Sequence, residues 1–336
     1  MSGSRITRRQ SGPIGTGLAP RAKPRRDAIA SASGPVVPAR AKERHVTHDT
    51  RPIQVRSSLD FQLDDRIPRH WNGGDPYKTR FFDAMSLTFP IGERYFITTV
   101  RAYKDRITDP QLLQEVKDFT RQEGQHGMVH TRFNDMLEQQ GQDVAWTQRF
   151  LDAKFRWQLS SWSKSFNLAY TTAAEHLTAM MCTTFFERAE IVEPFDPRIR
   201  AMYAWHSVEE VEHKAVCFDV LTKVAKAGYF TRVAALLYFT VEYTLGNWYM
   251  VNHMLKSDGF GFWKRMGMLA RGAWWLYKPG GVFMPAAGFY LSYFKPGFHP
   301  WQHQEMGTYG AWLETFERTG DPIAAAQSLT AAAAAR

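Results

Sequence analysis

Apolar residues recur every three or four positions along most of the chain after residue 76, the spacing that places them on one face of a helix. No stretch keeps the alternation of apolar and polar residues that is typical of a strand. The pattern therefore predicts an all-α protein, most simply a helical bundle. The expected helical segments are 77–88 leading through Pro90 to 103, 109–140, 143–157, 163–192, 196–227, 230–256, 260–276 and 303–318.

Two of the expected helices have clear start signals. Asp109-Pro110 and Asp196-Pro197 each place a carboxylate that can cap a helix directly before a proline. Proline is favoured at the first helical position because the N–H that it lacks has no partner inside the helix there. These dipeptides fix where two of the long helices are expected to begin.

The ends of the chain differ from this helical middle. Residues 1–57 contain six prolines and no aromatic residue, so we expect a disordered basic tail there. A single helical domain is expected over 58–320, with its metal-binding helices within about 77–220 and extra helices over about 229–320. The alanine-rich end, 321–336, is expected to be a flexible tail, either helical or frayed.

The positive charge of the chain is confined to its beginning. The whole chain has a formal net charge of +9, and residues 1–57 alone carry twelve Lys and Arg against three Asp and Glu. The remaining residues hold thirty of each sign, so the expected domain has no electrostatic signature of nucleic-acid binding. The tail could contact an anionic membrane surface, or it could simply be a solvated arm.

Cysteine content and the N-terminus bear on the compartment. Cys182 and Cys217 are the only cysteines, which is neither a disulfide framework nor a zinc-ribbon spacing, and a reducing cytoplasmic location fits. The N-terminus lacks the apolar region of a secretory signal; its arginine-rich composition also resembles a transit peptide. The apolar run 233–255 is interrupted by Glu242 and His253, so we do not expect a transmembrane span there.

Two copies of one motif carry the strongest chemical signal. Glu123 and His126 are separated by three positions, which places both side chains on one face of their helix. Glu210 and His213 repeat this spacing on a later helix, and His206 lies one turn before Glu210 on the same stripe. A single Glu-x-x-His occurs often by chance, whereas two copies on separate long helices indicate a metal site.

Two further glutamates complete the pattern. Glu93 and Glu175 each lie among apolar and small residues on the other two long helices, and glutamate is rarely buried without a partner. One glutamate from each of two helices plus Glu-x-x-His from each of the other two is the ligand layout of ferritin-like di-iron carboxylate proteins. The alternative is a set of buried salt bridges between helices, with Arg94, Lys214 or Arg121 as counter-charges.

These residues resemble two known families. The pattern His206-x-x-x-Glu210-x-x-His213 resembles the arylamine N-oxygenases of the p-aminobenzoate type, over roughly 80–220, and that resemblance implies a non-haem di-iron centre that activates O2. The phrases around Glu93 and His213 also resemble a bacterial family labelled predicted metal-dependent hydrolases, over most of the expected domain.

Three functions remain open at this stage. Carboxylate and imidazole ligands without thiolate suit iron or manganese, and zinc is also an alternative. Two ions could activate O2, as in an oxygenase or hydroxylase acting on a small organic or lipid-like substrate with an electron donor, or they could drive hydrolysis. We prefer the oxygenase, with the hydrolase second and a non-enzymatic metal-binding or membrane-surface protein third. Oligomerisation is left open.

Several neighbours of the expected ligands have secondary interpretations. Aromatic residues could form a dry pocket, although core packing is the simpler explanation; two threonines could hydrogen-bond bound oxygen. These residues are Tyr95, Phe96, Tyr170, Trp205, Thr171 and Thr178. His130 is interpreted as a supporting residue rather than a ligand, and His176 points to another face. Glu209 and Glu212 are expected to face solvent or neighbouring helices.

Overall fold

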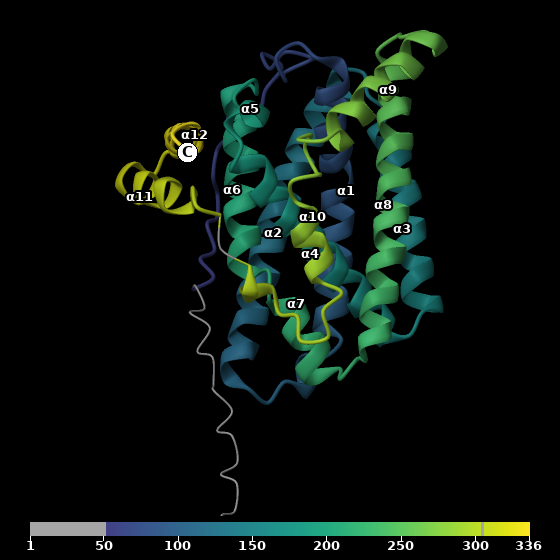
Figure 1. Cartoon of the computed structure of the whole chain (residues 1–336), viewed down its shortest axis with the longest axis vertical. Coiled ribbons are helices and arrows are strands. Elements are labelled where there is room, and N and C mark those ends of the chain that lie inside the picture. Colours follow the sequence, from purple (N-terminus) through teal and green to yellow (C-terminus); the bar gives the residue numbers. More distant parts are fainter. Residues whose placement is uncertain (1–51, 304–305) are drawn as a thin grey trace, which may run out of the picture. The chain divides into compact units, whose positions relative to one another are not determined.

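The computed structural model describes residues 52–303 and 306–336, and in this part of the chain every regular element is helical (Figure 1). The all-α bundle that the sequence predicts is confirmed. The α-helices are α1 (Pro76–Arg101), α2 (Pro110–Gln139), α3 (Val144–Ser161), α4 (Lys164–Phe186), α5 (Ala189–Val192), α6 (Pro197–His213), α7 (Val216–Asp219), α8 (Tyr229–Ser257), α9 (Phe262–Tyr277), α10 (Ala287–Ser292), α11 (Tyr309–Thr319) and α12 (Pro322–Ala334).

Helix starts follow one local rule. Each of α1, α2, α6 and α12 begins with an aspartate cap followed by proline, and the aspartate side chain accepts a hydrogen bond from a backbone N–H in the first turn. The caps are Asp75, Asp109, Asp196 and Asp321. Such a cap stabilises a helix by about 1 kcal/mol, so these dipeptides define the helix starts largely through local interactions.

Four long helices form the centre of the bundle. Helix α1 packs along α2 and α4, and α6 packs against α4 and α2. The buried aromatic residues Phe82, Phe185 and Trp205 belong to the main hydrophobic core among these helices. Helix α4 is apolar around most of its circumference, as a helix enclosed by others must be. The four helices that carry the expected ligands are therefore direct neighbours.

Further helices cover this centre. Helix α8 lies along α1 and α4, and α3 lies along α1 (Figure 1). Helices α11 and α12 pack on each other and, through α12, on α6 (Figure 1). We expected 321–336 to be a flexible tail, either helical or frayed; most of it is the helix α12, which is packed against the bundle, with Ala325, Ala326 and Leu329 fully buried. Small alanine side chains let this helix approach α6 closely.

Two expected helices are broken in the structure. The segment expected as 196–227 ends as an α-helix at His213, continues as the short α7, and widens into the π-helical segment η2 (Val220–Val224). The segment expected as 163–192 stops at Phe186 and resumes as α5. The π-helical segment spans only five residues, which is too short for apolar periodicity to distinguish it from an α-helix.

The start of the described chain also differs from expectation. Most of the expected tail 1–57 lies outside the described residues. Residues 53–57, however, run as an extended segment along the bundle, and the side chain of Arg56 is buried. In the described part of the chain, no helix combines the length and apolar character that crossing a bilayer requires.

Candidate metal centre

The four central helices bring all seven sequence-predicted residues together in the interior. Helix α1 contributes Glu93 and α4 contributes Glu175. Helix α2 contributes Glu123 and His126, and α6 contributes the rest, which are His206, Glu210 and His213. All seven side chains are buried. Helical spacing on α2 and α6 produces this convergence because residues three and four positions apart share a face.

The seven residues form three overlapping groups that could each hold an ion. In each group, the ligand atoms lie within 4.8 Å of one another. The groups are Glu93, His126 and His206; Glu123, His126 and Glu210; and Glu123, Glu175 and His213. The first and third share no residue, and the second joins them. The second group shares His126 with the first and Glu123 with the third, so the three groups form one continuous cluster of candidate ligands.

The contacts inside the cluster leave strong donors and acceptors unused. His213 Nε2 lies 3.2 Å from Glu123 Oε1 and 3.4 Å from both Glu175 Oε2 and Glu210 Oε2. Nevertheless, both carboxylate oxygens of Glu93 and of Glu123 are buried without a hydrogen-bond partner. Buried carboxylates are costly unless something compensates them, and metal coordination is one such compensation. The residues present therefore fit a metal centre.

Each histidine of the cluster is supported on its other ring nitrogen. His126 Nε2 lies 3.2 Å from Glu209 Oε2, His213 Nδ1 lies 2.8 Å from Gln122 Oε1, and His206 Nδ1 lies 3.0 Å from His130 Nε2. Metal-ligating histidines usually have such a partner, which fixes the ring orientation and tautomer. The prediction that His130 supports the site rather than ligating a metal agrees with this contact.

The support extends to the start of the described chain. Arg56 pairs with Glu209 at 3.3 Å and with Glu212 at 2.8 Å, and its backbone N–H also donates to Glu209. Gln122, which holds His213, donates its own amide to Glu212 at 2.9 Å and to the carbonyl of Gln54 at 3.0 Å. Neither Glu209 nor Glu212 faces solvent, so that part of our expectation is wrong: both are buried links between α6, α2 and residues 54–56.

Without a metal, the carboxylates compete for protons. Burial, reinforced by the neighbouring carboxylates, raises the pKa of Glu93 well above its usual value. Burial and the Glu210 charge raise the pKa of Glu175 to about 8. Burial also acts to raise the pKa of Glu210, but His213 and His206 outweigh it and hold that pKa well below the usual value. In the metal-free cluster, Glu210 therefore loses its proton most easily, whereas Glu93 and Glu175 keep theirs to higher pH.

The histidines respond in opposite directions. Burial alone would lower the pKa of His126 and of His213, but the adjacent carboxylates raise both well above the usual value. The pKa of His206 falls to about 4 because of burial and the nearby His126 charge. His206 is thus held in the neutral form that a metal ligand requires.

Two of the cations proposed for the salt-bridge alternative, Arg94 and Arg121, pair outside the cluster. Arg94 pairs with Asp152 and Arg121 with Asp118, both toward solvent, and Lys214 donates to the carbonyl of His303. None of these ion pairs involves the seven clustered residues. The cysteines are buried with raised thiol pKa values and belong to none of the three groups, so the donors are carboxylate oxygen and imidazole nitrogen alone.

Comparison with known proteins decides the family. Residues 54–304, about three quarters of the chain, match the family described as predicted metal-dependent hydrolase. The chain belongs to this family. The match supports a metal-dependent enzyme of the hydrolase type and gives no support to an oxygenase. No curated protein matches the chain, and neither does any solved structure. The resemblance to the N-oxygenases stays a prediction.

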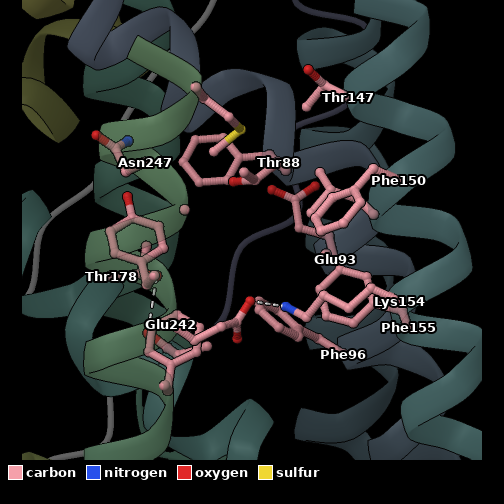
Figure 2. A pocket seen from close by; sticks show the side chains of 18 of the residues that line it. Thr88, Glu93, Phe96, Thr147, Phe150, Lys154, Phe155, Thr178, Glu242 and Asn247 are labelled. Atoms are coloured by element: carbon pink, nitrogen blue, oxygen red, sulfur yellow. Dashed lines mark hydrogen bonds and ion pairs between the residues drawn. The ribbon is translucent and has the colours of Figure 1, made fainter. Parts of the chain in front are cut away.

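In this member of the predicted metal-dependent hydrolase family, an apolar cavity leads to the centre. The cavity has a volume of about 550 Å³ and lies between α3 and α8 (Figure 2). Glu93, His206 and Glu210 line one part of it, and Phe96, Phe150 and Phe155 are among its apolar walls. Glu93 points into this space from α1 (Figure 2). A small apolar molecule can therefore reach the ligand cluster.

An ion pair between α3 and α8 lies in the same cavity. Lys154 on α3 pairs with Glu242 on α8, and Tyr170 on α4 donates to Glu242 at 2.5 Å (Figure 2). Burial lowers the pKa of Lys154 despite this pairing. Sequence reasoning missed Lys154 as a pocket residue, because nothing in its local pattern indicates that α3 faces α8.

The other neighbours divide between packing and the cavity. Tyr95 donates to Asn167, Thr171 bonds Thr99, and Trp205 donates to Glu209, so these three are structural or supporting. Phe96, Tyr170 and Thr178 line the cavity. His176 packs among Phe289, Tyr293 and Phe298, away from the cluster, as expected.

Proposed function

We propose that this protein is a two-metal hydrolase acting on an ester or phosphoester with a large apolar part. The observation that carries the proposal is the set of three linked ligand groups at the end of an apolar cavity. Membership of the predicted metal-dependent hydrolase family points in the same direction. The cavity favours substrates with a large apolar part, because aromatic and aliphatic side chains provide most of its lining surface.

In this proposal, Glu93, His126 and His206 would hold one ion, Glu123, Glu175 and His213 would hold the other, and Glu210 would add a further carboxylate to the set. Two bound ions would supply a nucleophile from water near neutral pH and would polarise the scissile group. The oxygen of water bonds to the acyl carbon or phosphorus, the bond to the alkoxy oxygen breaks, and the alcohol leaves with a proton. Iron, manganese and zinc all accept this ligand set.

The chain's own residues would prepare the reaction. Glu209, Gln122 and His130 orient the three imidazoles. Phenyl rings in the cavity keep bulk water away from the substrate, and the Lys154–Glu242 pair offers a charged anchor along a mainly apolar path. Rigid helices carry every expected ligand, so the geometry is set before substrate arrives.

The first test is metal content and anaerobic turnover. We expect about two ions per chain by elemental analysis, and hydrolysis of p-nitrophenyl esters or phosphoesters without O2 when the protein is loaded with zinc or manganese. Glu123→Ala/Glu210→Ala should lose both ions and activity, whereas Glu138→Ala, at an exposed position on α2, should keep both. Absence of metal in all three proteins after reconstitution would exclude a metal enzyme.

The second candidate is a di-iron oxygenase that uses O2 and an electron donor. It is favoured by a buried set of four carboxylates and three imidazoles without a thiolate, which suits iron. This function predicts an absorbance change when the reduced iron protein is mixed with O2. An iron-loaded protein that is inert to O2 yet hydrolyses esters anaerobically would eliminate it.

A further inference from the structure

The outward face of α8 has an unusual composition for a surface helix. Exposed side chains follow one stripe along five turns and carry no charge; they are Phe230, Ala234, Leu237, Val241, Leu245 and Trp248. Val241 is 59% exposed and Leu245 is 63% exposed. Contiguous apolar surface of this kind marks an interaction site, because water contact with it is unfavourable. We call these six residues the α8 stripe.

Helix α9 adds an amphipathic surface with basic residues beside it. Trp263, Ala270, Trp274 and Tyr277 are exposed at helical spacing on one side. Trp263 is 84% exposed and Trp274 is 65% exposed. A second exposed row, seven residues apart each time, consists of Lys264, Arg271 and Lys278. Tryptophan and tyrosine beside a row of Lys and Arg are typical of helices that lie in a membrane interface.

Charge complementarity favours anionic lipid as the occupant of this face. Residues 259–303 contain five Lys and Arg and no Asp or Glu. The acidic residues of α8 and the turn after it are both compensated: Glu242 pairs with Lys154, and Asp258 pairs with Arg80. An anionic bilayer offers both an apolar interior for the tryptophans and negative headgroups for the basic row.

Two cavities reach the surface at this face. The cavity that leads to the metal centre and a second one of about 470 Å³ are both lined by Leu245 of the α8 stripe. Trp248 and Tyr277 line the second cavity together, so the exposed surfaces of α8 and α9 adjoin there. An acyl chain leaving a bilayer beneath this face would therefore meet an apolar path toward Glu93 and Glu210.

We propose that the α8 stripe and the exposed side of α9 dock on anionic membrane surfaces, and that the substrate is a lipid taken from the bilayer. The docking is independent of the chemistry, whereas the substrate clause rests on the proposed function. Binding comes from burial of tryptophan and aliphatic side chains, reinforced by contacts of the basic row with headgroups.

The test is cosedimentation of the full-length protein with phosphatidylcholine vesicles, with and without phosphatidylglycerol. Wild-type protein should bind the phosphatidylglycerol vesicles. Trp263→Glu/Trp274→Glu should weaken binding by roughly tenfold or more, since two apolar anchors become charged. Lys264→Glu/Arg271→Glu/Lys278→Glu should reduce the preference for phosphatidylglycerol relative to wild type. Every altered side chain is exposed, so unchanged circular dichroism should accompany both variants.

Controls separate this face from the rest of the chain. Residues 1–57 are present in every variant, so any contribution of their positive charge cancels in the comparison. Met128→Glu alters an exposed apolar residue on α2 and should bind like wild type. Equal vesicle binding by wild type and the tryptophan variant would overturn the proposal. A dimer seen by light scattering and lost in that variant would also overturn it, by assigning the face to a second copy.

The docking proposal and the hydrolase proposal can be rejected independently of each other. Metal-free protein should bind vesicles as wild type does, because none of the docking residues belongs to the ligand groups. If the protein binds vesicles but hydrolyses neither soluble nor vesicle-borne esters, the hydrolase proposal fails and docking stands. If it hydrolyses soluble esters without binding vesicles, docking fails and the hydrolase proposal stands.

Discussion

At the scale of single residues, sequence spacing predicted which ligand residues would converge. It did not predict the neighbouring side chains that orient them. Glu210 and His213 could be identified because three positions define a shared helix face. Glu209 was expected to face solvent or a neighbouring helix, and it lies against His126 of α2 and pairs with Arg56. Its role depends on a partner that lies 153 positions earlier, and no local pattern reveals such a contact.

Glu209→Gln tests this supporting role. The substitution keeps the size of the side chain but removes the charge that faces His126 Nε2. We expect metal affinity to fall about 10–100-fold while the helical content is retained. Titration calorimetry with manganese measures the affinity, and Glu138→Gln on the exposed side of α2 is the matched control. Equal affinity for both variants would show that Glu209 is only a packing residue.

Metal binding should depend on pH through Glu175. In the metal-free protein its pKa is about 8, so below that pH an incoming ion must displace a proton from this carboxyl. Affinity should therefore rise with pH up to about 8, by about tenfold per unit for each displaced proton. Competition with a chromogenic chelator on either side of this pH measures the slope. Glu175→Gln should have a shallower slope; an unchanged slope would assign the protons to other groups.

At the scale of elements, helix starts were predictable and helix interruptions were not. Asp109-Pro110 and Asp196-Pro197 act through local hydrogen bonds, so the expected and observed starts agree. The α-helix stops after His213 where the chain packs as α7 and η2 against α2 and α4, and these long-range contacts leave no local pattern in the sequence. Order in α12 likewise depends on the α6 surface that it covers, which an alanine-rich sequence does not specify.

Asp258 ties several elements together at the end of α8. It accepts hydrogen bonds from Arg80 on α1, from Arg69, and from Gln142 before α3. Burial would raise its pKa, but Arg80, Arg69 and His70 hold the pKa at about 2. Asp258→Asn should lower the free energy of unfolding by about 3 kcal/mol at neutral pH, because buried Arg80 loses a charged partner.

The loss of unfolding free energy in Asp258→Asn should depend on pH in a defined direction. A carboxyl whose pKa falls from 3.8 to about 2 on folding adds stability that is fully present above pH 3.8. Protonation removes this contribution as the pH falls toward 2, so the stability difference between wild type and Asp258→Asn should narrow over that interval. Urea unfolding at a series of pH values measures it. A constant difference would mean that Asp258 acts through shape rather than charge.

At the scale of the whole molecule, the spacing of apolar residues correctly predicted the all-α fold class, but it did not predict the cavity. The cavity is lined by residues from α1, α3, α4, α6 and α8. Each of these helices has an apolar face that fits a core as well as a pocket. Whether such faces close on one another or leave space depends on their relative placement, which periodicity does not encode.

Gly246→Trp tests the cavity as a substrate-binding site. Gly246 lines the cavity, and no atom lies within 4 Å of where its Cβ would be, so a side chain can enter without disturbing the backbone. For wild type, we expect kcat/KM on p-nitrophenyl esters to rise about threefold to fourfold per added methylene until the cavity is filled. The variant should lose this rise and keep its activity on the acetate ester.

Gly310→Trp on α11 is the control, because its Cβ position is equally open and it does not line this cavity. If kcat/KM depends on acyl-chain length in the same way in wild type and in both variants, the substrate binds outside this cavity.

The contacts of Glu212 have a consequence for the order of events during synthesis. This carboxylate joins Arg56, which lies 156 positions before it, to Tyr309, which lies 97 positions after it. Contacts between such distant positions form late, because long loops must close first. The four ligand helices have all left the ribosome before the α11 segment, yet the network behind His126 and His213 is complete only when both flanking segments have docked. Capture of metal during synthesis would therefore be weak, and tight retention would begin only once the α11 segment has docked.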